Sequence, residues 1–247
     1  MTHEVIEWSM VLLNAVAGVW SLQAHRNKLF RLLSTLAFFS GIVSTADHTL
    51  FIYYVEENLS FDDKDIAKIF LIIGVMGMFV QTVVLKPLNS RIGERRVIMV
   101  AFFVGAIHNY LYGVAKDKRT IFLSATIASL TGMSFPTISA IKANNVEESE
   151  QGRIQGALYS LSALASALGP LSLRYVYHKT KDSTGGFGKG TMFIFGAGLY
   201  LIAVVCAWLL PEEQANSNFK RDEKKRSSLV DFDRGKVDYG ALIQEEA

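Results

Sequence analysis

The chain has 247 residues, half of them hydrophobic, and a net charge of +2 at pH 7. This small charge does not indicate nucleic-acid binding, and the basic clusters lack the interleaved aromatic residues of a nucleic-acid interface. The single cysteine, Cys206, lies within a hydrophobic run, which excludes an intrachain disulfide and a cysteine-based metal site. The five histidines are scattered without metal-ligand spacing, and the sequence contains no phosphate-binding loop, dinucleotide fingerprint or Ser–His–Asp arrangement. We therefore expect neither an enzyme nor a bound metal or cofactor.

The N-terminal segment, residues 1–27, contains a hydrophobic stretch from Val5 to Leu22. This stretch includes Glu7 and Asn14 and has no basic start, which makes it a poor signal peptide. Three alternatives remain for it: the stretch spans a membrane, lies in the membrane interface, or reflects a faulty gene model.

Further along the chain, six stretches carry almost no charge, and each has about the 20 residues that a helix needs to cross a bilayer. They are Leu32–Val55, Ile66–Leu85, Val97–Ala115, Thr120–Ile141, Ile154–Leu173 and Thr191–Leu210. None shows the polar stripe of a water-soluble helix. Because backbone groups in lipid must be satisfied within the segment, the sequence predicts an all-α membrane protein with six transmembrane helices, or seven if the N-terminal stretch also spans.

The charged residues between these stretches predict the orientation. Residues 23–31, the 86–96 loop and the tail are basic, which places them in the cytoplasm. The tally is 16 Lys and Arg residues inside against 9 outside, although the outer loops 116–119 and 174–189 are themselves basic. The tail, residues 211–247, is too polar to fold alone. We expect it to be a disordered cytoplasmic C-terminus, whose basic 220–226 cluster sets the topology rather than forming a specific lipid site.

The first stretch contains two adjacent ionisable residues, Asp47 and His48. An aspartate within a membrane is unfavourable unless it faces a cavity or a partner. Asp47 lies about 24 Å along the helix from Arg31 at 1.5 Å per residue, so the alternative is that both residues are solvated near the outer surface. In the third stretch, His108 and Asn109 are expected to form hydrogen bonds between helices.

The loop between the second and third stretches carries a motif, Lys86-Pro-Leu-Asn-Ser-Arg-Ile-Gly-Glu-Arg-Arg96. It resembles the loop motif of the major facilitator superfamily, Gly-x-Leu-Ala-Asp-Arg-x-Gly-Arg-Lys. The matching residues are Leu88, Arg91, Gly93 and Arg95, whereas Lys86 and Ser90 replace the first Gly and the Asp. A glycine here allows a tight turn, and the arginines are expected to bond helix-end carbonyls and carboxylates, holding two helices in one of two arrangements. The alternative is a plain basic turn.

A second pattern opens the fifth stretch, where an acidic loop precedes Gln151-Gly152-Arg-Ile-Gln155-Gly156 and a small-residue helix then reaches Gly169-Pro170. The pattern is similar to the tetracycline-efflux-like and hippocampus-abundant-transcript-like branch of the superfamily. Spacing places Gly152, Gly156 and Ser160 on one ridge, which allows another helix to approach closely. Generic helix packing explains these glycines, but explains the paired glutamines less well.

The resemblance covers about residues 28–210 and implies the C-terminal six-helix half of a major facilitator fold. In that fold the first and fourth stretches line the central pathway. The candidate pathway residues are therefore Asp47, His48, Ser129 and Pro136, with Asp47 the candidate proton or cation site. Pro136 also removes a backbone donor and permits a bend in its helix.

A major facilitator holds its solute between two halves of the fold. The resemblance therefore implies a secondary carrier in the lipid bilayer, which moves a small solute, with proton coupling as one option. It also implies a second half, supplied as a homodimer or as a separate N-terminal half. Two alternatives are a truncated or non-transporting scaffold or sorting protein, and a seven-helix, receptor-like arrangement.

Overall fold

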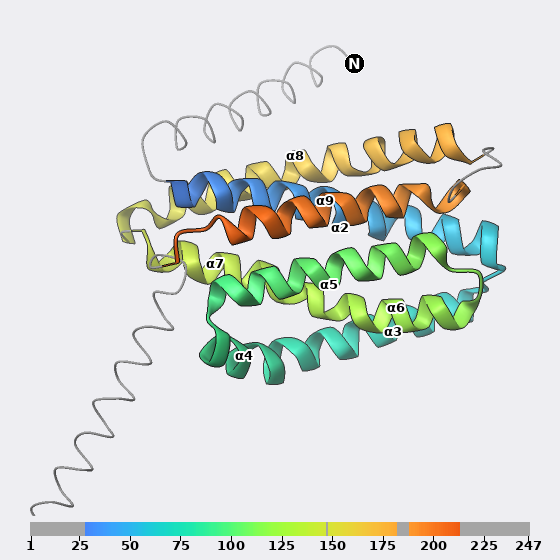
Figure 1. Cartoon of the computed structure of the whole chain (residues 1–247), viewed down its shortest axis with the longest axis horizontal. Coiled ribbons are helices and arrows are strands. Elements are labelled where there is room, and N and C mark those ends of the chain that lie inside the picture. Colours follow the sequence, from blue (N-terminus) through green and yellow to red (C-terminus); the bar gives the residue numbers. More distant parts are fainter. Residues whose placement is uncertain (1–27, 147, 182–187, 213–247) are drawn as a thin grey trace, which may run out of the picture.

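The computed structural model describes residues 28–146, 148–181 and 188–212 (Figure 1). The hydrophobic stretch near the N-terminus and the basic cluster of the tail lie outside these residues. Within the described ranges the chain forms helices joined by short connections, with no strand.

The described chain follows six rods. The α-helices are α2 (Lys28–Leu59), α3 (Asp63–Phe79), α4 (Leu85–Ile92), α5 (Glu94–Val114), α6 (Lys118–Ala128), α7 (Ser134–Asn144), α8 (Glu148–Thr180) and α9 (Thr191–Trp208). A π-helical turn, η1 (Val80–Val84), joins α3 to α4, and a 3-10 segment, η2 (Ser129–Met133), joins α6 to α7. A short 3-10 turn, η3 (Gly188–Gly190), precedes α9.

These rods confirm the six stretches predicted to cross the membrane, because all six are long and apolar enough to span a bilayer. The predicted boundaries were too narrow for several of them. The first helix begins at Lys28 and ends at Leu59, and the fifth runs from Glu148 to Thr180. The extra turns carry charged residues, which a search for uncharged runs omits.

The helices lie nearly side by side (Figure 1). α5 packs most extensively against α9, α2 packs against both α8 and α9, and α3 packs against α6. At the contact between α2 and α8 the backbones come very close. A Cβ added at Gly169 would lie 2.4 Å from the Ile42 carbonyl oxygen, and one at Gly41 would lie 2.9 Å from the Ala165 Cβ. Small residues therefore set the distance between these two helices.

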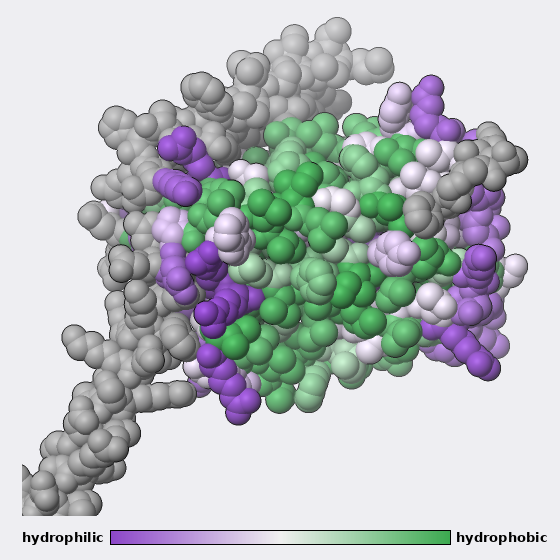
Figure 2. Space-filling model, viewed as in Figure 1, coloured by the Kyte–Doolittle hydropathy of each residue, from purple (hydrophilic) through white to green (hydrophobic). Residues whose placement is uncertain are grey.

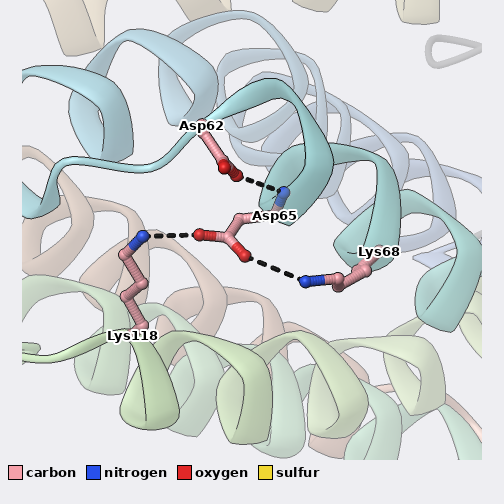
Figure 3. Close-up of polar contacts among 4 residues, drawn as sticks. All are labelled: Asp62, Asp65, Lys68 and Lys118. Carbon is pink, nitrogen blue, oxygen red and sulfur yellow. Dashed lines mark hydrogen bonds and ion pairs between the residues drawn. The ribbon is translucent and has the colours of Figure 1, made fainter.

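Ion pairs connect the helices at one end of the bundle, which is the predicted outer end (Figure 3). Asp62 caps α3 by accepting the backbone N–H of Asp65 at 2.8 Å. The Asp65 carboxylate binds Lys118 at the start of α6, and also Lys68 one turn along its own helix (Figure 3). This contact holds the first turns of α3 and α6 together.

A second contact at the same end involves Glu57, near the end of α2. Its carboxylate accepts the Tyr177 hydroxyl of α8 at 2.6 Å and the Lys189 ammonium of η3 at 3.0 Å. In the neighbouring connection, Asp117 caps α6 by accepting the Thr120 N–H at 2.7 Å. This hydrogen bond lowers the pKa of the Asp117 carboxyl, because it stabilises the charged form.

The surface of the bundle matches a bilayer. A broad hydrophobic band lies between two hydrophilic ends (Figure 2). Large exposed apolar side chains contribute to this surface, among them Leu71, Met78, Leu123, Leu171, Tyr175 and Trp208. Burial is uneven: 11% of the α3–α4 span and 17% of the α8 span are buried, against 56% of α5. The α3–α4 rod and α8 are thus the spans least covered by the rest of the described chain.

The glycine contact between α2 and α8 generates the first prediction. Gly169→Ala should lower the unfolding temperature in mild detergent, because its Cβ collides with backbone that has no rotamer to relax. Overpacking of this kind costs about 1–3 kcal/mol. The matched control is Gly198→Ala on α9, where a Cβ would meet nothing within 4 Å, so the change should be neutral or slightly stabilising. Equal unfolding temperatures for the two variants would contradict the packing argument.

Candidate functional site

A cavity of about 640 Å³ lies within the described bundle. Its walls come from α2, the α3–α4 rod, the α6–α7 rod and α8, and residues of α5 and α9 form its base. Polar lining residues include Asp47, His48, Gln81, His108, Lys142 and Gln155. Several lining side chains are also largely exposed, among them Met78 (69%) and Tyr159 (58%). The cavity is therefore open to the surface of the described chain.

At the base of the cavity, Asp47 of α2 is directed toward α5. The Asn109 amide nitrogen donates to Asp47 Oδ2 at 3.0 Å, and His108 Nε2 lies 3.4 Å from the same oxygen. Ser124 of α6 fixes this part of α5 by donating to the His108 carbonyl at 2.8 Å. The Asp47 side chain is only 15% exposed, so it is held between helices rather than at a solvated surface. This Asp47–His108–Asn109 group is called the acidic cluster below.

The acidic cluster allows two proton arrangements. The Asn109 amide nitrogen lies 3.0 Å from His108 Nε2 as well as 3.0 Å from Asp47, and its two hydrogens can serve both when the imidazole is neutral. When the imidazole is charged, Nε2 is a donor and can turn to Asp47 instead. Within the described residues, Asp47 Oδ1, His108 Nδ1 and Asn109 Oδ1 are buried without a hydrogen-bond partner. The cluster therefore contains buried atoms that are available to bind a proton.

The other predicted pathway residues lie close to a break in helical geometry. Ser129 opens the 3-10 segment η2 and lines the cavity, although its hydroxyl bonds the Ala125 carbonyl of its own helix. Pro136 lies just beyond this segment in α7 and is not among the lining residues. The π-helical turn η1, which supplies Gln81, packs against η2. Two irregular segments thus meet at the cavity wall, a placement common at functional sites.

At the other end of the cavity, Lys142 of α7 donates to Gln155 Oε1 of α8. Lys142 is 5% exposed, although it lines the cavity. It lies eighteen residues after Ser124, which contacts the acidic cluster, so the two groups are roughly 27 Å apart along the helix.

The segment predicted as a loop is largely helical: the motif runs through α4, turns at Gly93 and continues into the first turn of α5. Gly93 ends one helix and begins the next at φ 82°, a conformation that favours glycine. Leu88 packs with a small apolar cluster, and Arg91 is exposed. Arg95 connects α5 to the neighbouring α9. It donates to the Trp208 carbonyl at the end of α9, and its guanidinium lies 3.5 Å from the Glu212 carboxylate. Arg95 therefore makes the kind of contact expected of the motif, to a helix-end carbonyl and a carboxylate.

Comparison with known proteins identifies the family. The Major Facilitator Superfamily model matches residues 33–242. The chain belongs to the Major Facilitator Superfamily. The structure of the human organic anion transporter MFSD10 (TETRAN) has the same fold as the described bundle, with a TM-score of 0.62 at 22% identity, over 72% of this chain and 40% of that one.

Among superfamily members, mouse hippocampus abundant transcript-like protein 1 is 22% identical over 81% of this chain and 42% of its own length. Tetracycline resistance protein, class G, of Vibrio anguillarum is 28% identical over 70% of this chain and 43% of its own length. The chain thus spans less than half the length of these relatives. These matches confirm both the superfamily suggested by the loop motif and the branch suggested by the Gln–Gly pattern.

The predicted small-residue positions of α8 separate into two groups. Gly169 is buried against α2, and Pro170 follows it inside the helix. Gly152 and Gly156 are exposed, and a Cβ at either would meet nothing within 4 Å. Gln155, between them, is half-buried and bonds Lys142. The exposed glycines therefore have no packing partner in the described chain.

Several lining residues were not predicted as site residues from the sequence, namely Gln81, Tyr112, Lys142 and Tyr200. Lys142 directly follows the predicted fourth stretch, where the sequence alone indicates an ordinary charged helix end. A useful signal was its position one turn beyond Ile138 and Ser139, which also line the cavity. The two tyrosines resemble ordinary core aromatics in sequence, and both pack against the His108 ring.

The Arg95 contact generates the second prediction. Arg95→Ala removes the donor to the Trp208 carbonyl, so the end of α9 should fray. The amides of Leu209 and Leu210, which bond Val205 and Ala207, should then exchange hydrogen faster, by roughly tenfold for a charge-assisted bond. The matched control is Arg96→Ala, because Arg96 is the exposed neighbour. Identical exchange in both variants would exclude Arg95 as the stabilising contact.

Proposed function

We propose that this chain forms one half of a secondary carrier that moves a small solute across a bilayer through the cavity described above. The observation that carries the proposal is the position of the polar groups: Asp47 and His108 of the acidic cluster line the same cavity as Lys142, in a bundle with a broad hydrophobic surface band (Figure 2). Polar groups at membrane depth are unfavourable unless they pair or serve a pathway. Membership of the superfamily and the transporter among its matches support membrane transport of a solute.

The cavity requires a second wall, which we propose to be another six-helix half of the same architecture. The α3–α4 rod and α8 border the cavity and are the least buried spans. Both carry glycines around which a Cβ would meet nothing within 4 Å: Gly74 and Gly77 on α3, and Gly152 and Gly156 on α8. Small residues of this kind allow another helix to approach closely. The second half is supplied by a second copy, a separate chain, or further sequence of a longer polypeptide.

The acidic cluster is the proposed coupling site. Asp47 and His108 are near enough to exchange a proton, and Asn109 can stabilise either arrangement. A proton bound here would neutralise the Asp47 carboxylate before the cavity closes to one side of the membrane and opens to the other. This step requires a carboxyl group at position 47, because another hydrogen-bonding group could not take up the proton.

The orientation follows from charge, with the C-terminus proposed to be cytoplasmic. The loop with Lys86, Arg91 and Arg96 is exposed at the end of the bundle where α9 ends. At the opposite end, Lys118 and Lys189 are paired with Asp65 and Glu57. Two of the outer lysines are thus paired with carboxylates, and the exposed basic residues of the loop favour the loop end as the cytoplasmic one.

The third prediction concerns coupling. Asp47→Asn should abolish solute accumulation driven by a pH gradient, because an amide retains the hydrogen bond from Asn109 but cannot take up a proton. Solute exchange across vesicles without a gradient should continue. Asp47→Glu, which keeps the carboxyl group, is the matched control and should retain part of the driven uptake. Undiminished pH-driven accumulation in Asp47→Asn would exclude Asp47 as the coupling group.

The fourth prediction concerns the second half. The smallest species that transports solute in vesicles should contain two six-helix halves, as measured by native mass spectrometry in mild detergent and by cross-linking in membranes. Bulky substitutions at Gly156, such as Gly156→Leu, should weaken association of the halves, whereas Gly198→Leu on the lipid-facing side of α9 should not. A single six-helix half that transports solute as a monomer would overturn the proposal, and a monomer without transport would favour a non-transporting product.

A further inference from the structure

A buried ammonium group at one end of the cavity has no negative partner among the residues that the structure describes. Lys142 is 5% exposed, and its hydrogen-bond acceptor is Gln155 Oε1, a neutral oxygen. Among the side chains that the structure describes, no carboxylate forms an ion pair with Lys142. A buried charge is unfavourable unless an opposite charge or several hydrogen bonds compensate it. One amide oxygen satisfies only one of the three donors of the ammonium group.

The acidic cluster cannot supply the missing charge. Asp47 lies roughly 27 Å away along the α6–α7 rod, counted from Ser124 to Lys142. Over such a distance a carboxylate does not form a hydrogen bond or an ion pair. Lys142 is therefore a separate positive site in the same cavity.

The groups around Lys142 are suited to an oxyanion. Gln155 has an amide nitrogen with two hydrogens, and Ser139 on the same face of the cavity has a hydroxyl donor. Apolar and aromatic lining residues follow immediately, namely Ile138, Leu158 and Tyr159. A ligand with an anionic head and an apolar or aromatic body fits this order of groups, because charge-assisted hydrogen bonds hold the head.

We propose that Lys142 and Gln155 form an anion-binding subsite, and that the solute carries a carboxylate or phosphate group. The anionic oxygen takes the place of Gln155 Oε1 on the ammonium, and the Gln155 amide turns to donate to the same anion. This inference rests on the proposed function only in treating the cavity as the solute path. The phosphate of a lipid headgroup has the same chemistry, but Lys142 is buried and lines the cavity rather than the outer surface.

Three substitutions isolate the subsite. Lys142→Gln removes the charge and keeps most of the length, whereas Lys142→Arg keeps the charge. Gln155→Glu places a permanent carboxylate beside the ammonium, so it should compete with any anionic ligand while the fold keeps its Lys142 contact. The matched control is Lys64→Gln, which neutralises an exposed lysine at the opposite end of the bundle.

The probes are 4-fluorobenzoate and its neutral isostere 4-fluorobenzamide, titrated by fluorine NMR against the full-length protein in phosphatidylcholine nanodiscs. We expect the benzoate to bind more tightly than the benzamide. Binding of the benzoate should weaken by about 10- to 100-fold in Lys142→Gln and in Gln155→Glu, the range for a charge-assisted hydrogen bond. Lys142→Arg and Lys64→Gln should retain binding within a few-fold, and circular dichroism checks that each variant is folded.

Equal binding of the two probes, absence of benzoate binding, or unchanged binding in Lys142→Gln would overturn the proposal. Nanodiscs that contain phosphatidylglycerol separate the two sources of anion. If this lipid displaces the benzoate from the wild-type protein but not from Lys142→Gln, the subsite holds a lipid headgroup and the solute assignment is wrong. The measurement uses no gradient and no second half, so a failure of transport does not affect its outcome.

Discussion

A carboxylate in the middle of an apolar bundle must have polar partners, and this constraint determines how the helices around the cavity meet. Asp47 finds its partners on α5, where Asn109 donates to it and His108 lies beside it. The contact fixes the rotation of α2 about its axis, which directs the other polar residues of α2 toward the same cavity. A neighbouring face of α2 packs through Gly41 and Ile42 on α8. One polar contact and one close backbone contact thus position two faces of the helix.

Hydropathy and length predicted the six spanning helices. A backbone in lipid must satisfy its own hydrogen bonds by forming a helix, and such a helix appears in the sequence as a long run of uncharged residues. The intramembrane position of Asp47 also pointed to the cavity. The irregular segments η1 and η2 could not be predicted, since they pack against each other at the cavity wall and the sequence does not reveal this contact. Likewise, Gly156 and Gly169 are the same residue type on one helix, yet only Gly169 touches α2. That difference depends on tertiary packing, which cannot be inferred from the spacing of glycines in the sequence.

Two of the basic residues at the predicted outer end form ion pairs between helices. In the sequence, lysines at both ends of the spans weaken the charge asymmetry. In the structure, Lys118 pairs with Asp65, and Lys189 pairs with Glu57 (Figure 3 shows the first pair). These pairs also connect α3 to α6 and α2 to η3, so the outer charges act as local contacts between helices. Exposed pairs of this kind contribute little stability individually, but together they fix the relative positions of the helix ends.

The two charged groups of the cavity have different consequences for a carrier. The acidic cluster lies between α2 and α5, within one half, so a proton there changes the charge of the cavity without needing the second half. Lys142 of α7 bonds Gln155 of α8, and Tyr159, which is 58% exposed, lies one turn further along α8. An anion held by Lys142 would therefore lie near the open side of the cavity and could contact both halves at once. A ligand that bridges two halves can favour one arrangement of them only if it binds that arrangement more tightly. In the proposed carrier, an anion site at the boundary and a proton site inside one half would separate the group that brings the halves together from the group that changes the charge of the cavity.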